Sequence, residues 1–179
     1  ITPYFLLVGI AGLEFLAGIP GTMGGALAMN AGAYGSEIKD VLISAKAVNN
    51  SGEIKEFSNA DIGYVYRGKE LSGDWIFTAC KLQGRYGNKE EIQQKILKIQ
   101  SDRSQTQPIK SRTGGSTFKN PIGYKAWELI DKAGCRGLQI GGARVSDMHC
   151  NFFINTGDAT AKDLEDLIQE FQRRFKESI

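Results

Sequence analysis

Cysteine, histidine and proline are scarce in this sequence of 179 residues, which has three cysteines, one histidine and four prolines. The cysteines, Cys80, Cys135 and Cys150, are widely separated and form no CxxC pair, so neither a disulfide framework nor a zinc site is favoured. With His149 as the single imidazole, there is no histidine-based metal cluster or catalytic triad. We therefore expect no metal, cysteines that act as small buried hydrophobic residues, a structural role for His149 and a reducing, cytoplasmic location.

An excess of charge of one sign is also missing. The formal net charge is +2, and 23% of the residues are charged against 41% hydrophobic. The basic residues are dispersed, so neither nucleic acid nor a membrane surface is expected as a partner, and local groups must bind any anionic ligand. The sequence indicates no obligate protein partner. Its length and composition suit a soluble protein with one large domain or two small ones.

Long uninterrupted hydrophobic runs are absent as well. Residues 1–21 are largely apolar, but Pro3, Gly9, Gly12 and Glu14 interrupt them and no basic segment precedes the apolar residues. We interpret this stretch as part of a folded core rather than as a signal peptide.

Glycine is plentiful, with 22 residues against four prolines, and six of the glycines lie in AGIPGTMGGALAMNAGAYG, residues 17–35. This spacing fits neither the GxGxxG dinucleotide motif nor the phosphate-binding P-loop. Glycines allow backbone N–H groups to approach a flat ring or a pyrophosphate closely. Tight packing of a turn against a strand would require the same residues, so the spacing alone leaves both interpretations open.

The hydrophobic pattern predicts an α+β fold. Strands are expected at residues 41–49, 53–57 and 75–84, as an antiparallel meander with a hairpin turn at NNSG, residues 49–52. A helix is expected from an Asn88 N-cap with Glu91 completing a capping box; its apolar face consists of Ile92, Ile96 and Ile99.

The later part of the chain alternates loops, helices and strands. A long polar loop is expected at residues 105–121, because proline bounds it and polar residues fill it. A short helix should end at Gly134, a buried strand should span residues 149–155, and a final amphipathic helix should begin at a Thr160 N-cap. We expect two domains, residues 1–87 and 88–179.

Five stretches in a fixed order resemble the UDP-N-acetylenolpyruvoylglucosamine reductase family, whose members are also called UDP-N-acetylmuramate dehydrogenases. They are GLEFLAGIPGTMGGALAMNAGAYG, GYVYRGKEL, RTGGSTFKNP, KAWELIDKAGCRGLQIGGARVS and HCNFFINTGDAT. The resemblance implies that residues 1–87 are part of a two-subdomain FAD-binding fold and that residues 88–179 form a mixed α/β domain that binds substrate. It also implies that NADPH reduces FAD, and that the flavin reduces an enolpyruvyl ether on a UDP-sugar to a lactyl ether in peptidoglycan precursor synthesis.

The same resemblance suggests roles for individual residues. It marks Arg67 as the group that binds the substrate carboxylate and Ser116 as the proton donor, with Gly114 and Gly115 giving its hydroxyl close access. Residues expected to bind the substrate are Tyr66, Lys110, Arg112, Lys119 and Asn120, with Arg136 and Arg144 as weaker candidates. The positive charges of Lys110, Arg112 and Lys119 are also expected to lower the cost of proton loss from Ser116. Residues expected to bind the cofactor are Gly18, Ile19, Pro20, Gly21, Thr22, Gly24, Gly25, Asn30, Gly32, Ala33, Tyr34 and Gly35.

Two features of the family have no counterpart in the sequence: an N-terminal flavin-binding subdomain and a glutamate motif after the last helix. We therefore expect the 179 residues by themselves to bind FAD weakly and to turn over poorly. Two alternatives remain open, namely a non-catalytic fragment that binds a UDP-sugar and an FAD oxidase of the same fold with another substrate. The proton-donor role implied for Ser116 argues against the oxidase, because an enzyme that removes hydride from its substrate has no carbanion to protonate.

Overall fold

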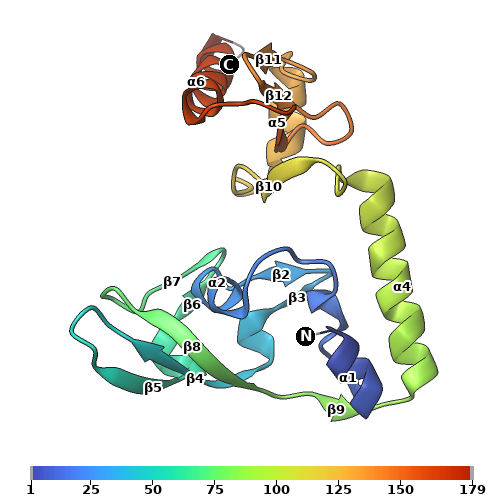
Figure 1. Ribbon diagram of the computed structural model, residues 1–179, viewed down its shortest axis with the longest axis vertical. Helices are drawn as coiled ribbons and strands as arrows, with labels where there is room; N and C mark the ends of the chain where they lie inside the picture. Colours follow the sequence, from blue (N-terminus) through green and yellow to red (C-terminus); the bar gives the residue numbers. More distant parts are fainter. Residues whose placement is uncertain (1, 178–179) are drawn as a thin grey trace. The chain divides into compact units, whose positions relative to one another are not determined.

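The computed structural model describes residues 2–177. The chain folds as two compact units, residues 1–101 and 102–179, and each is described here by itself (Figure 1). The division lies inside helix α4 (Lys89–Thr106), whereas the predicted domain boundary lies just before that helix. None of the helices in the described range has the length and apolar character that a membrane span requires.

The first unit is built on an antiparallel sheet of three strands in the order β5 (Ile54–Ser58), β4 (Leu42–Val48) and β8 (Ile76–Leu82). All three predicted strands are confirmed, but the meander was wrong because β8 pairs with β4 and not with β5. The physical reason lies in β4, where Ala45 and Ala47 are fully buried and so belong in the centre of the sheet.

The hairpin between β4 and β5 is confirmed at the predicted residues. Gly52 has a φ of +83°, which glycine adopts without steric cost. The N–H of Asn49 donates to the Glu53 carbonyl at 3.1 Å, and the Asn49 side-chain oxygen accepts the Ser51 and Glu53 N–H groups at 3.0 Å each. Side-chain and backbone hydrogen bonds within five residues therefore specify this turn.

The core of the first unit lies between this sheet and helix α2 (Met23–Ala28), which packs on β8. Leu27, Ile38 and Ile62 are fully buried there. A side chain at Gly24 would bring its Cβ to 2.9 Å from the Phe77 carbonyl oxygen, so glycine permits the close approach of helix and strand.

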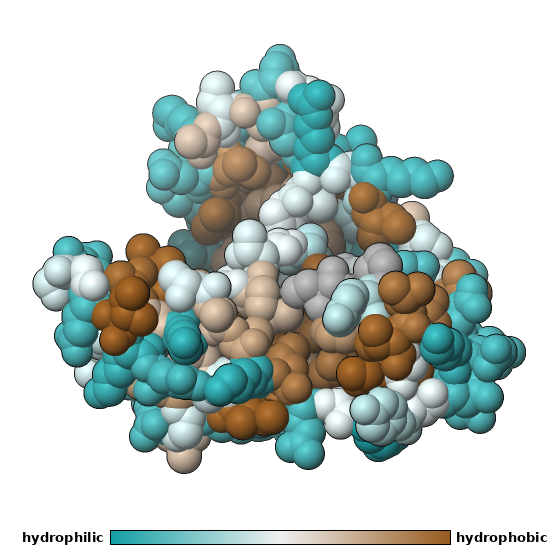
Figure 2. Space-filling model, turned by 60° about the horizontal axis from the view of Figure 1, so that its bottom comes forward, coloured by the Kyte–Doolittle hydropathy of each residue, from teal (hydrophilic) through white to brown (hydrophobic). Residues whose placement is uncertain are grey.

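The opening stretch is core only in part. Ala11, Leu13, Phe15 and Ala17 are buried, as predicted for residues 1–21. In helix α1 (Thr2–Val8), however, Leu7 is 70% exposed, so the apolar character of this helix does not place it inside the unit. Figure 2 shows hydrophobic residues on the drawn face of the molecule, and exposed apolar side chains of the first unit include Leu7, Ile43, Ile54 and Ile76.

Short elements complete the first unit. Strand β1 (Ile10–Ala11) pairs with β9 (Arg85–Tyr86), β2 (Gly32–Ala33) with β3 (Ser36–Glu37), and β6 (Tyr64–Val65) with β7 (Gly68–Lys69). The remaining helical turns are η1 (Glu14–Leu16), η2 (Ile38–Asp40) and α3 (Asn59–Ile62).

The predicted Asn88 N-cap of helix α4 is confirmed. The Asn88 side-chain oxygen accepts the Glu91 N–H at 3.1 Å, and Ile92, Ile96 and Ile99 form its buried face against Ala11 and Ala17.

The second unit combines a sheet in the order β10 (Arg112–Ser116), β13 (Phe152–Asn155), β12 (Ala143–Val145) and β11 (Gln139–Ile140) with helices α5 (Ala126–Lys132) and α6 (Ala161–Glu177). Its core includes Ile130, Val145 and Leu167, all fully buried. The predicted loop at residues 105–121 was wrong in two places, because α4 continues to Thr106 and residues 112–116 form an edge strand. Two adjacent glycines lower the strand propensity of residues 112–116, so the sequence alone does not indicate a strand there. The extended conformation of β10 is instead stabilised by its pairing with β13.

The other predicted elements of this unit are confirmed, except that the strand expected at residues 149–155 begins only at Phe152. Helix α5 is followed by Gly134 at a φ of +67°, and the Cys135 N–H closes the turn on the Ile130 carbonyl at 3.2 Å. Thr160 and Asp163 exchange side-chain-to-backbone hydrogen bonds of 2.9 and 3.1 Å at the start of α6. Cys135 and Cys150 are buried free thiols as expected, whereas Cys80 is only partly buried.

Candidate functional site

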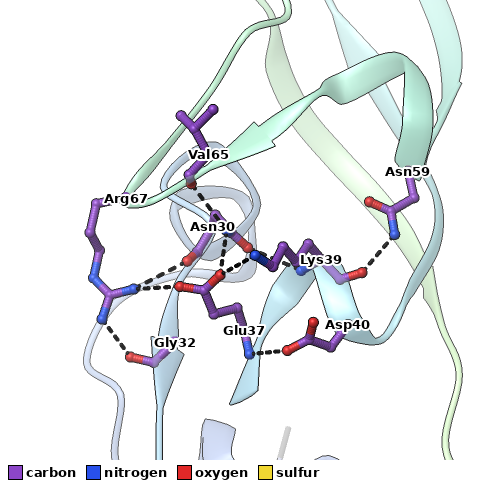
Figure 3. Close-up of polar contacts among 8 residues, drawn as sticks. All are labelled: Asn30, Gly32, Glu37, Lys39, Asp40, Asn59, Val65 and Arg67. Carbon is purple, nitrogen blue, oxygen red and sulfur yellow. Dashed lines mark hydrogen bonds and ion pairs between the residues drawn. The ribbon is translucent and has the colours of Figure 1, made fainter. Parts of the chain in front are cut away.

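Asn30 is the centre of a polar cluster in the first unit. Its side chain is fully buried and all of its principal hydrogen-bonding groups are used (Figure 3). Nδ2 donates to the Glu37 carboxylate at 3.0 Å and to the Val65 carbonyl at 3.1 Å, and Oδ1 accepts the Lys39 N–H at 3.0 Å. Asn30 thereby ties the glycine-rich segment to the β6–β7 hairpin, which comes more than 30 residues later in the sequence.

Arg67 follows β6 and extends its guanidinium back to the glycine-rich segment. Nη2 donates to the Gly32 carbonyl at 2.9 Å, and Nη1 lies 3.5 Å from both the Asn30 carbonyl and the Glu37 carboxylate. The Tyr66 ring lies 4.9 Å from the guanidinium carbon, close enough for a cation–π interaction. The cation is therefore held at the predicted cofactor segment, and 32% of its side chain stays exposed.

Three non-glycine residues in the described part of the chain have positive φ, and all three belong to the predicted site. They are Asn30 at +44°, Tyr34 at +54° and Arg67 at +54°. Left-handed backbone is uncommon for residues other than glycine and is concentrated at functional sites. The Tyr34 hydroxyl is anchored by a 3.2 Å bond to the Ile99 carbonyl.

The glycines predicted to bind a cofactor serve two purposes. At Gly32 a Cβ would lie 2.7 Å from Glu37 Cγ and 2.8 Å from the Ser36 carbonyl oxygen, so glycine is required there by packing, as at Gly24. Gly21 and Gly35 have positive φ values of +118° and +79°, and a Cβ at either position would meet no described atom within 4 Å. The backbone at these two positions is thus open to a ligand, whereas Gly24 and Gly32 shape the segment.

The other predicted cofactor residues line the same segment. Gly18 has a φ of +84°. Thr22 caps α2 by accepting the Gly25 N–H at 3.1 Å. Pro20 is exposed and Ile19 and Ala33 are partly buried.

Ser116 lies in the second unit, at the end of edge strand β10. The pairing of β10 with β13 shifts register between Thr113 and Ser116, and Gly115 between them has a φ of +91°. The residue is exposed. The backbone two residues later is fixed by Asn151, which directly precedes β13: its side chain accepts the Phe118 N–H at 2.9 Å and donates to the Phe118 carbonyl at 2.8 Å.

The predicted substrate residues of the second unit differ in whether they bond to other parts of the chain. Lys110 and Lys119 are exposed. Arg112 donates to the Gly157 carbonyl at 3.3 Å, and Asn120 accepts the Ala126 N–H at 2.9 Å, where α5 begins. Asn120 therefore has a structural function in its own unit, and its substrate role remains a prediction.

The two weaker candidates are engaged in ion pairs. Arg136 binds Asp131 with two hydrogen bonds of 2.9 and 2.7 Å, which lower the pKa of that carboxyl, and Arg144 pairs with Asp147. His149 accepts the Asn151 N–H at 3.3 Å and its ring lies 4.8 Å from that of Phe152; burial lowers its pKa, which favours the neutral form. These contacts are consistent with the predicted structural role of His149.

Sequence reasoning missed Glu37 and Asn151. Glu37 comes two residues after the glycine-rich motif, which ends at Gly35, and Asn151 lies within the motif HCNFFIN. Acidic and amide side chains are common on protein surfaces, so only their contacts in the structure distinguish Glu37 and Asn151 from ordinary surface residues.

The glycine-rich segment belongs to a flavin-binding class of domain, because residues 8–58 match the family described as FAD binding domain. Residues 107–179 match the family described as UDP-N-acetylenolpyruvoylglucosamine reductase, C-terminal domain. Together the two matches indicate similarity to the UDP-N-acetylenolpyruvoylglucosamine reductases.

Individual relatives agree with this assignment. The chain is 57% identical over 170 residues to the UDP-N-acetylenolpyruvoylglucosamine reductase of Parvibaculum lavamentivorans, a match that covers 95% of the chain and 55% of the relative. It is 56% identical over 158 residues to the enzyme of that name from Rickettsia akari, covering 88% of the chain and 54% of the relative. The crystal structure of UDP-N-acetylenolpyruvylglucosamine reductase from Thermus caldophilus matches with a TM-score of 0.89 and 35% identity, covering 96% of the chain and 64% of that structure. The chain thus spans a little more than half the length of the curated relatives it matches.

Proposed function

We propose that the protein containing this chain is an FAD-dependent, NADPH-driven reductase of the cytoplasm. It converts UDP-N-acetylglucosamine enolpyruvate to UDP-N-acetylmuramate in peptidoglycan precursor synthesis. The names of the relatives support this reaction. The structural observation that carries it is the Arg67 guanidinium, which bonds to the Gly32 carbonyl of the glycine-rich segment while part of its side chain stays exposed.

The glycine-rich segment is proposed to hold the FAD. Gly21 and Gly35 support this role because their backbone lies open, which suits the approach of a flat ring or a pyrophosphate. When bound, FAD supplies a hydride to the terminal vinyl carbon of the substrate. The residues proposed to line its site are Gly18, Ile19, Pro20, Gly21, Thr22, Gly24, Gly25, Asn30, Gly32, Ala33, Tyr34 and Gly35.

Arg67 is proposed to bind the carboxylate of the enolpyruvyl group. Hydride addition to the vinyl carbon places an electron pair on the carbon next to this carboxylate, and the charge spreads onto the carboxylate oxygens. A guanidinium bound there stabilises the charge as it develops, which lowers the barrier more than it strengthens substrate binding. Tyr66, stacked near the guanidinium, would line the same pocket.

Ser116 is proposed to protonate that carbon. Its Oγ–H bond breaks as the new C–H bond forms, which completes the reduction and leaves a serine alkoxide that solvent reprotonates. A hydroxyl is a weak acid, but a carbanion is a strong base, and nearby cations lower the cost of proton loss. The exposure of Ser116 at the end of an edge strand supports access to a ligand. Lys110, Arg112, Lys119 and Asn120 are proposed to contact the substrate's anionic and sugar groups.

A stopped-flow experiment on the natural protein tests this function. Anaerobic NADPH should bleach the flavin absorbance, and the enolpyruvyl UDP-sugar should then restore it with one lactyl ether formed per flavin. UDP-N-acetylglucosamine, which has no vinyl group, is the matched control and should leave the flavin reduced. Reoxidation by oxygen but not by the enolpyruvyl substrate would instead indicate an oxidase, and UDP-sugar binding without any flavin would indicate a binding protein.

A further inference from the structure

We propose that Glu37 is a positioning residue for Arg67: its carboxylate orients the guanidinium so that the Nε–Nη2 edge stays free to bind a carboxylate with two parallel hydrogen bonds. The inference rests on the proposed function, in which that carboxylate belongs to the substrate. It adds a residue that no motif pointed to.

The hydrogen-bond donors of Arg67 show which edge is available. A guanidinium carries five N–H bonds. Nη1 faces the Asn30 carbonyl and the Glu37 carboxylate, and Nη2 uses one of its hydrogens on the Gly32 carbonyl. Within residues 2–177 no acceptor is bonded to Nε, which lies on the side of the guanidinium away from Glu37 (Figure 3). Nε and the second Nη2 hydrogen are the pair that a carboxylate binds in a fork-to-fork arrangement.

Glu37 is itself held in place by groups other than Arg67. Its Oε2 accepts Asn30 Nδ2 at 3.0 Å and lies 3.1 Å from Lys39 Nζ, and its side chain also accepts the Asp40 N–H in a capping box at η2. The carboxylate is 21% exposed. Because three other donors fix it, its position does not depend on Arg67, and it can serve as a prearranged acceptor for Nη1.

The charges explain how an acidic residue can stand beside an anion-binding arginine. Glu37 faces two cations, Lys39 at 3.1 Å and Arg67 at 3.5 Å, so the three side chains together keep one positive charge. An incoming carboxylate therefore still meets a net positive group. The long 3.5 Å contact also leaves the guanidinium only partly neutralised, since Coulomb energy falls with distance.

The plainer alternative is that Glu37 only caps η2. A substitution of Asp40 distinguishes the capping role from the positioning role. The Asp40 carboxylate accepts the Glu37 N–H at 2.8 Å in the same capping box, but Arg67 is not among its partners in the described chain. Asp40→Asn is thus the matched control for Glu37→Gln. Both variants remove one negative charge from the same turn, but only Glu37→Gln removes the charge that faces the Arg67 guanidinium.

The test measures NADPH-dependent flavin reduction and turnover of the enolpyruvyl UDP-sugar separately in the natural protein. For Glu37→Gln we expect kcat/KM for the UDP-sugar to fall about tenfold, the size expected from loss of one charge-assisted hydrogen bond. The rate of flavin reduction should change less than twofold, and Asp40→Asn should change both rates less than twofold. In an Arg67→Lys background, Glu37→Gln should add no further loss, because it acts through the arginine.

Several results would overturn the proposal. They are an equal loss in Asp40→Asn, a parallel loss of flavin reduction in Glu37→Gln, or a loss that simply adds to that of Arg67→Lys. Unchanged turnover in Glu37→Gln would also overturn it. Absence of turnover in the wild-type protein would instead reject the proposed function, so the two failures are distinguishable.

Discussion

The guanidinium of Arg67 donates a 2.9 Å hydrogen bond to the carbonyl oxygen of Gly32, which joins a residue after β6 to the glycine-rich segment. The same arginine bears one of the strained φ values, and a Cβ at Gly32 would lie 3.2 Å from its Nη1. The glycine therefore makes room for the cation as well as accepting its hydrogen bond.

Replacing Gly32 with alanine should destabilise the first unit. The added Cβ would lie 2.7 Å from Glu37 Cγ and 2.8 Å from the Ser36 carbonyl, so side chains and backbone must shift. We expect a loss of about 1 to 3 kcal/mol in the free energy of unfolding, measured with urea. Gly114→Ala is the control, since a Cβ there meets no described atom within 4 Å. An equally small effect of both substitutions would contradict the packing argument.

Removing the Asn30 side chain should be costly. Asn30→Ala leaves the Val65 carbonyl and the Lys39 N–H without their side-chain partner in a buried place. Unsatisfied buried polar groups cost about 1 to 3 kcal/mol each, so a loss of about 2 to 4 kcal/mol is expected in urea unfolding. Asn59→Ala, which removes one exposed hydrogen bond to the Lys39 carbonyl, should cost less than about 1 kcal/mol. Similar losses for the two would show that burial of Asn30 is unimportant.

Substitution of Ser116 should separate the two halves of the reaction. In Ser116→Ala of the natural protein, NADPH should still reduce the flavin, while formation of the lactyl ether should fall about 100-fold or more because the proton donor is lost. Product is quantified by chromatography after a single turnover. Ser111→Ala, just before the same strand, should leave both steps unchanged. Equal slowing of both steps in Ser116→Ala would rule out the proton-donor role.

The ion pairs of α6 should make stability depend on pH in acid. Hydrogen bonds from Arg173 and Arg174 lower the pKa of Glu170 to about 2 from its usual 4.5. Because the folded-state pKa is the lower one, the stabilisation is present above about pH 4.5 and is lost as the pH falls toward 2. We expect Glu170→Gln to lower the melting temperature at pH 6 but not at pH 2, whereas Glu165→Gln on the same helix should show no such difference. A constant effect of Glu170→Gln across this range would contradict the ionic explanation.

Much of the local structure could be predicted because the signals lie within a few residues. Asn88 and Thr160 start their helices, Gly134 follows the end of α5, and Gly52 closes its hairpin, each through hydrogen bonds that span five residues or fewer. The edge strand β10 could not be predicted in this way. Its glycines have low strand propensity, and its extended conformation depends on pairing with β13, some forty residues later in the sequence.

The amino-acid sequence by itself carried the family resemblance through its ordered motifs. It also determined the α+β class and the positions of the capped helices and the tight hairpin, since these depend on residue type and short-range hydrogen bonds. Only the tertiary structure decided that β4 is central in its sheet and that Asn30, Glu37 and Arg67 meet. The physical reason is that contacts between distant segments depend on which surfaces become buried together, and no short pattern encodes that choice.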